Sequence, residues 1–153
     1  TTLFRSCYLP PMNERLKIRS IEIARAMFDP AEHKERCYVA CICWYKNRLV
    51  QVGINKDKTH TVNYRYNPLI CRRTGRIIRE DKGTCAELSA FLAIKNKTNY
   101  DFRDISMVTV RINRKLQISM AKACSSCSNL IRFIAPKEVF FTNEKGEFEQ
   151  YIY

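Results

Sequence analysis

Three cysteines and one glutamate have the residue types and the spacing that suit a zinc centre. Cys85 precedes Glu87 by two positions, and a Cys-x-x-Cys pair further along the chain supplies Cys124 and Cys127. Three thiolates can hold one tetrahedral zinc ion and leave its fourth position to water, whose pKa zinc lowers to about 7. The pattern predicts Cys85, Cys124 and Cys127 as zinc ligands. It predicts Glu87, close to that water but not bound to the metal, as the catalytic group that moves protons.

Each part of this pattern also has a simpler interpretation. Thr84 and Glu87 fit a capping box, in which the glutamate only caps a helix. A Cys-x-x-Cys pair by itself is also typical of a redox pair or of half a structural zinc site. A four-ligand structural site needs one more partner, for which the chain offers His33, His60 and Cys71. Such a site would leave Glu87 without a role at the metal.

The elements that must position these residues follow from the apolar pattern. Helical spacing, with capping and breaking residues at the ends, predicts helices at 12–28, at 84 to about 96–99 and at about 125–134. Short apolar or alternating runs predict strands at 37–45, 49–54, 105–112, 139–142 and 148–153. The predicted order is α-β-β-α-β-α-β-β. Strand 37–45 is apolar on both faces, which predicts a central strand in a covered sheet.

The same pattern predicts which side chains are buried. The buried stripes are expected at Leu16, Ile23, Ala24 and Met27 in the first helix, Leu88, Phe91 and Leu92 in the second, and Leu130, Ile131 and Ile134 in the third. In strand 49–54, the residues predicted to share one face are Val50, Val52 and Ile54. In strand 37–45, Cys37, Cys41 and Cys43 are predicted to be reduced core residues.

The predicted zinc ligands fall at the starts of two helices. Thr84 and Ser125 are the expected first residues of the second and third helices. The positive end of a helix dipole stabilises thiolates. Two helices that begin side by side on one sheet face would bring Cys85, Cys124 and Cys127 to one point.

Length and charge narrow the class of protein. The chain has 153 residues, 46% of them hydrophobic and 27% charged, which is typical of one globular domain spanning 1–153, with 1–11 as an N-terminal extension. Twenty-seven Lys and Arg against fifteen Asp and Glu give a net charge of +12, which favours an anionic partner or substrate over a merely solvated surface. No apolar run approaches the ~20 residues of a membrane span. The first residues lack the apolar region of a signal peptide, so we expect a cytoplasmic location with the eight cysteines not paired as disulfides.

Residues 56–83 are predicted to form a long basic loop insertion. Its charged residues are Lys56, Lys58, Arg65, Arg72, Arg73, Arg76, Arg79 and Lys82 against Asp57, Glu80 and Asp81. Tyr64 and Tyr66 flank Arg65, an arrangement that can stack bases while the arginine meets a phosphate. We assign Arg65, Arg72 and Arg73 to substrate binding. The alternative is a basic flap that is only solvated.

The chain resembles the cytidine deaminase-like superfamily over roughly residues 12–153. The resemblance rests on the order of elements and on two motifs, Cys85-Ala86-Glu87 and Cys124-Ser125-Ser126-Cys127. Cys-Ala-Glu with three cysteine ligands looks like the small cytidine deaminases and the blasticidin deaminases. The resemblance implies a three-layer α/β/α sandwich with a mixed five-stranded sheet. The closing hairpin, 139–153, is similar to the branch with antiparallel last strands, which also holds many toxin and phage deaminases.

The resemblance also implies substrate-binding residues. Asn55, in Gly53-Ile54-Asn55, resembles the position where relatives place an asparagine on the substrate sugar, and Ala86 of the Cys-Ala-Glu motif is assigned with it. Ala123 departs from the family, which usually has proline there. That change loosens the loop and removes no ligand. The usual Phe-x-x-x-Asn nucleoside signature is not evident, which argues against free cytidine as the substrate.

The sequence therefore predicts a zinc-dependent hydrolase that deaminates cytosine in a nucleotide or in single-stranded nucleic acid. The small three-cysteine relatives suggest a homo-oligomer. One alternative is a non-catalytic, basic nucleic-acid-binding protein on a deaminase fold with a structural zinc, for which an intact Glu87 is not needed. Another is a thiol oxidoreductase that uses Cys124 and Cys127.

Overall fold

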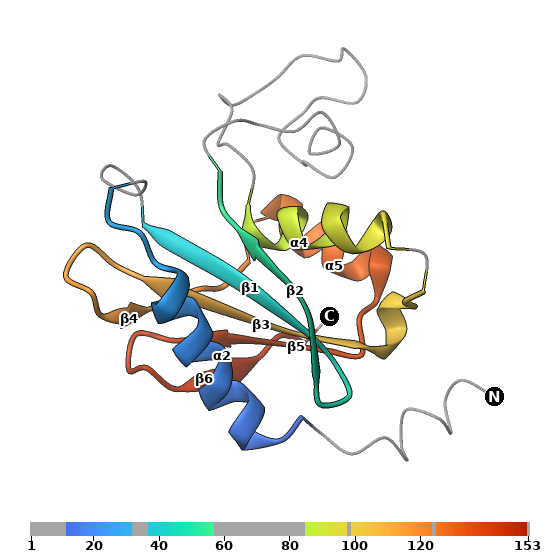
Figure 1. Cartoon of the computed structure of the whole chain (residues 1–153), viewed down its shortest axis with the longest axis horizontal. Helices are drawn as coiled ribbons and strands as arrows, with labels where there is room; N and C mark the ends of the chain where they lie inside the picture. Colours follow the sequence, from blue (N-terminus) through green and yellow to red (C-terminus); the bar gives the residue numbers. More distant parts are fainter. Residues whose placement is uncertain (1–11, 32–36, 57–84, 98, 124, 153) are drawn as a thin grey trace, which may run out of the picture.

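Three α-helices and a mixed sheet make up the described part of the chain (Figure 1). The computed structural model describes residues 12–31, 37–56, 85–97, 99–123 and 125–152. The elements are α2 (Glu14–Met27), β1 (Tyr38–Tyr45), β2 (Arg48–Ile54), α4 (Ala86–Lys95), the 3-10 helix η1 (Phe102–Asp104), β3 (Ile105–Ile112), β4 (Ile118–Ser119), α5 (Ser125–Ile134), β5 (Glu138–Thr142) and β6 (Phe148–Gln150). The three predicted helices and five predicted strands are all present. No helix in these described ranges is long and apolar enough to cross a membrane.

The sheet has the strand order β2-β1-β3-β5-β6, and the short β4 pairs with β3. β1 is antiparallel to both β2 and β3, which confirms it as an inner strand. β3 and β5 are parallel, so the chain must cross over between them, and α5 provides the crossover. β5 and β6 are antiparallel, as predicted for the closing hairpin. The expected five strands become six, because two residues of β4 pair with β3 and a run that short has no detectable period.

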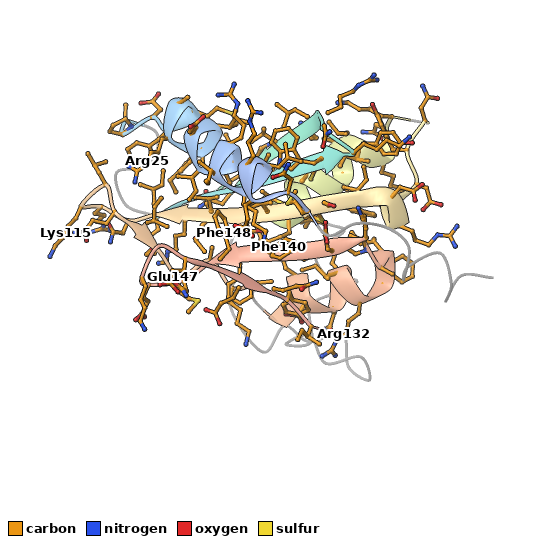
Figure 2. All side chains as sticks on the ribbon, turned by 90° about the horizontal axis from the view of Figure 1, so that it is seen from below. Arg25, Lys115, Arg132, Phe140, Glu147 and Phe148 are labelled. Carbon is orange, nitrogen blue, oxygen red and sulfur yellow. The ribbon has the colours of Figure 1, made fainter. Side chains whose placement is uncertain are left out.

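Helices cover both faces of the sheet. Figures 1 and 2 show α2 on one side of the strands and α5 on the other, and in Figure 1 α4 lies beside α5. One core cluster lies beneath α2 and includes Ala24, Ile42 and Val108. A second cluster, with Cys41, Leu88 and Ile131, lies between the sheet and α4 and α5. The predicted α/β/α layering therefore follows from two apolar faces on one sheet.

The buried side of α2 differs from the predicted stripe. Met27 is 44% exposed, whereas Lys17 and Ser20 are buried. The Ser20 hydroxyl accepts a hydrogen bond of 2.8 Å from the indole N–H of Trp44. The Lys17 ammonium lies 4.0 Å from the ring centroid of Phe140. Polar groups can be buried when partners satisfy them, and apolar periodicity does not reveal those partners.

One residue of β2 also faces the side opposite to the prediction. Val52 and Ile54 pack on the α2 face, but Val50 packs against the cluster beneath α4 and α5. The pairing of β1 with β2 shifts between Cys43 and Trp44, which leaves one extra residue in β2. Such a β-bulge interrupts the alternation of side chains along a strand, so the predicted common face is wrong for Val50.

Candidate metal centre

Two helix N-termini carry the candidate ligands. Cys85 is the N-cap of α4, with φ −69° and ψ 157°, and Glu87 is the second residue of the helix. Cys127 is the third residue of α5. Glu87 and Cys127 are only 4% and 1% exposed, and Cys85 is half-buried. The first turns of both helices therefore direct ionisable groups into the protein, where the helix dipoles favour the thiolate form.

Cys85, Glu87 and Cys127 converge on one point. Their Sγ and carboxylate oxygen atoms all lie within 4.8 Å of one another. Two thiolates bound to one tetrahedral zinc at ~2.3 Å lie about 3.8 Å apart, so this spacing fits a shared ion. The two thiols suit zinc, which takes sulfur ligands, and the carboxylate beside them can serve either as an oxygen ligand or as a proton acceptor. The third predicted ligand, Cys124, lies outside the described residues.

The helix boundary bears on the capping-box interpretation. A capping box places its glutamate at the third helical position after the N-cap. Because Cys85 is the N-cap, Glu87 occupies the second position. The structure therefore does not have the register that a Thr84–Glu87 capping box requires, and Thr84 itself lies outside the described residues.

Two cysteines of β1 lie beneath the cluster. Cys41 and Cys43 are buried and free, as predicted, whereas Cys37 at the start of the strand is only half-buried. A hydrogen bond with Cys43, burial, and the nearby charges of Cys43 and Glu87 raise the pKa of the Cys41 thiol well above its ordinary value. Cys41 therefore stays a neutral thiol at pH 7, so it places no negative charge next to the Glu87 carboxylate.

Gly53 allows α4 to approach the sheet at this point. Gly53 of β2 lies beside Cys41 in the ladder. A Cβ atom at position 53 would collide with the carbonyl oxygen of Ala86 and the backbone nitrogen of Ala90. The spacing of apolar residues in strand 49–54 does not by itself predict a structural role for Gly53. An isolated glycine within a strand pattern is a known signal of close backbone approach, and that signal was available.

The predicted substrate-binding residues have different surroundings. The Asn55 side chain accepts a hydrogen bond from the Val39 N–H and donates one to the Cys37 carbonyl, both at 2.9 Å. It therefore extends the β1–β2 ladder, and its contact with a sugar stays a prediction. Ala86 is fully buried. The remaining candidates lie outside the described residues: Arg65, Arg72 and Arg73, with the alternative ligands His33, His60 and Cys71.

Comparisons with known proteins do not name a family. The chain matches no family model, and searches of curated proteins and of solved structures gave no significant match. The geometry of the centre is therefore the main guide to its chemistry.

Proposed function

We propose that this protein is a zinc-dependent hydrolytic deaminase that acts on cytosine in a phosphorylated substrate, either a nucleotide or single-stranded nucleic acid. One observation carries the proposal: two thiols and a buried carboxylate meet at the starts of α4 and α5. The cytidine deaminase-like resemblance of the sequence, and a sheet that closes with an antiparallel pair, also support it.

Cys85, Cys127 and, by the sequence motif, Cys124 are the residues that would hold the metal. Bound zinc supplies a water molecule that is deprotonated readily at neutral pH. The neutral Cys41 thiol beneath the centre adds no charge that would compete with the ligands. Gly53 keeps the first turn of α4, and with it Glu87, close against the sheet.

Glu87 is the proposed proton carrier. Its carboxylate would accept a proton from the attacking water and deliver it to the ring nitrogen of cytosine, and the second water proton would leave with the amino group as ammonia. The net reaction consumes water and converts cytosine to uracil. A positioned acid–base group of this kind typically contributes ~10²–10⁴-fold to the rate. The low exposure of Glu87, 4%, keeps competing bulk water away from the proton path.

The charge of the protein supports a phosphorylated substrate. A net charge of +12 attracts phosphates by long-range electrostatics. The target carbon of cytosine cannot be reached inside a duplex, so a polynucleotide substrate has to be single-stranded or have its base flipped out.

The test measures zinc content and ammonia release on a panel of cytidine, deoxycytidylate, single-stranded DNA and single-stranded RNA. We expect about one zinc per chain and ammonia from at least one phosphorylated member of the panel. Glu87→Gln should lower turnover by about 10²–10⁴-fold while zinc stays bound. Glu138→Gln is the matched control, because Glu138 is also a buried glutamate, 7% exposed, but lies in β5 with Ser106 as its hydrogen-bond donor.

Two results would contradict the proposal. Zinc without turnover on any member of the panel would indicate the non-catalytic binding protein. A protein that binds no zinc would remove the basis for both interpretations.

A further inference from the structure

Arg111 is a half-buried cation with an incomplete set of partners. It is the next-to-last residue of β3. One terminal nitrogen of its guanidinium donates to the Cys37 sulfur at 3.0 Å, and the other donates to the Met120 carbonyl at 3.4 Å. Its Nε is buried and has no acceptor among the described residues. Sulfur is a weak acceptor, so most of the donor capacity of this guanidinium is unused.

The charge of Arg111 also has no counterion in the described part of the chain. Ion pairs there join Lys17 to Glu14, Arg19 to Glu22 and Arg103 to Asp101, and none of these involves Arg111. A charge withdrawn from water is costly unless an opposite charge and hydrogen bonds compensate it. The site around Arg111 therefore suits an anion with several acceptor oxygens, which a guanidinium binds in a forked geometry.

The position of Arg111 connects it to the metal centre. Side chains alternate along a strand, so Arg111 and Thr109 project from the same face of β3, the face covered by α4 and α5. Thr109 pairs with Cys41 in the β1–β3 ladder, and Cys41 lies close enough to Glu87 for the charge of that carboxylate to raise the pKa of its thiol. Arg111 lies two residues further along, about 7 Å by the rise of a strand.

The hydrogen bond from Arg111 to the Met120 carbonyl also places Arg111 near the metal centre. Met120, whose carbonyl holds the guanidinium, belongs to the segment that enters α5, where Cys127 lies in the first turn. In that segment, Ala123 packs against the core cluster beneath α4 and α5. The guanidinium is thus held between the start of β1 and the chain that leads into the metal centre.

We propose that Arg111 binds a phosphate group of the substrate at the rim of the metal centre and selects phosphorylated substrates over free nucleosides. This inference rests on the proposed deaminase function. The shared chemistry is a phosphate, either the monoester of a free nucleotide or a diester within a strand. A phosphate is separated from its base by the sugar, which matches a cation near, but not at, the proton-carrying carboxylate.

A binding experiment tests the phosphate site independently of turnover. Inorganic phosphate is titrated into the full-length, zinc-loaded protein at constant ionic strength and followed by ³¹P NMR. We expect saturable binding to the wild type and a loss of roughly ten- to hundredfold in affinity for Arg111→Gln, since hydrogen bonds to charged groups are involved. Arg25→Gln is the control with the same charge change. Arg25 lies on α2, near Lys115 in Figure 2, and its guanidinium donates to the Leu116 carbonyl at 3.5 Å.

Kinetics then identify the source of the phosphate. If the site binds a phosphate monoester, the preference of the enzyme for deoxycytidylate over cytidine, measured as the ratio of the two kcat/KM values, should fall about tenfold or more in Arg111→Gln. If the site binds a phosphate diester, the ratio of kcat/KM for single-stranded oligodeoxycytidylate to kcat/KM for cytidine should fall instead. Unchanged ratios for both substrates would overturn the proposal.

The outcomes separate this inference from the proposed function. Ammonia release from no substrate would contradict the deaminase, and the phosphate titration would still decide the role of Arg111. Equal phosphate affinity in the wild type and Arg111→Gln, or no saturable binding to the wild type, would overturn it. If Arg111→Gln does not fold, Arg111→Lys replaces it. Lysine lacks the forked, two-pronged donor geometry of a guanidinium, so phosphate binding should weaken several-fold. Wild-type affinity in Arg111→Lys would refute the assignment.

Discussion

The two faces of the sheet bury polar groups in opposite ways. On the α2 face, Trp44, Ser106 and Glu138 form one row across three strands, and the Ser106 hydroxyl donates to the Glu138 carboxylate at 2.9 Å. On the other face, the corresponding row contains Gly53, Cys41 and Thr109, with the first turn of α4 packed directly above it. The first row consists of polar-tipped side chains that have hydrogen-bond partners, and the second row consists of small side chains beneath a helix start.

The contrast is clearest in the two buried glutamates. Glu87 and Glu138 have similar exposures of 4% and 7%. Glu138 has a serine hydroxyl as its partner within the sheet, whereas the Glu87 carboxylate lies among the thiols of Cys85 and Cys127. Burial alone therefore does not mark a functional carboxylate. The two thiols beside Glu87 at a helix N-terminus are what distinguish it from Glu138 and make it the candidate functional carboxylate.

Among changes to the two faces of the sheet, enlarging the small-residue row should have the largest effect, because it alters both stability and turnover. Gly53→Ala forces a methyl group into the backbone of α4 at Ala86 and Ala90, so the helix has to shift. We expect a loss of about 1–3 kcal/mol in the free energy of unfolding, because the site is overpacked. Turnover should fall at least tenfold with it, since ~1 Å of misplacement of a catalytic group is enough for such a loss. Urea unfolding and ammonia release measure the two effects.

The control for this substitution is Gly146→Ala. Gly146 has φ +77° and no atom within 4 Å of an added Cβ, so its substitution strains only a turn. It should lower stability by roughly 1–2 kcal/mol and leave turnover unchanged. A Gly53→Ala protein with normal turnover would show that the close approach of α4 does not position Glu87.

Removing a polar partner on the α2 face should affect stability alone. Ser20→Ala leaves the buried indole N–H of Trp44 without its acceptor, so we expect a loss of about 1–3 kcal/mol in the free energy of unfolding. Zinc content and turnover should not change. A double-mutant cycle with Trp44→Phe isolates the hydrogen bond. Additive effects in that cycle, or altered turnover in Ser20→Ala, would contradict the separation of the two faces.

The smallest effect is a pH dependence on the α2 face. Burial raises the pKa of Tyr38 from its ordinary value of 10.0 to about 12. The folded protein then holds the phenol proton more tightly than the unfolded chain. The resulting stability is complete below pH ~10 and is lost as the pH rises towards ~12.

Tyr38→Phe should remove this alkaline loss. We expect the stability of the wild type relative to Tyr38→Phe to fall by about 1 kcal/mol between pH 9 and pH 11. Urea unfolding of both proteins at the two pH values measures the difference. Parallel stability curves would show that Tyr38 does not titrate differently in the folded and unfolded states.

The sequence by itself was sufficient for the regular elements and for three residues of the centre. Three helices and five strands were predicted from the spacing of apolar residues, because a face that packs on a core has to repeat with the period of its element. Cys85, Glu87 and Cys127 were predicted from local motifs at expected helix starts. Their convergence needed only two helices that begin on the same sheet face.

What the tertiary structure decided involves contacts between distant segments. The β-bulge at Val50 depends on how β2 pairs with β1, and the burial of Lys17 and Ser20 depends on partners in β5 and β1. The importance of Gly53 depends on the backbone of α4. Local spacing encodes the face of an element because that face is set by its own period. Partners across the fold have no such period, so only the packed structure reveals them.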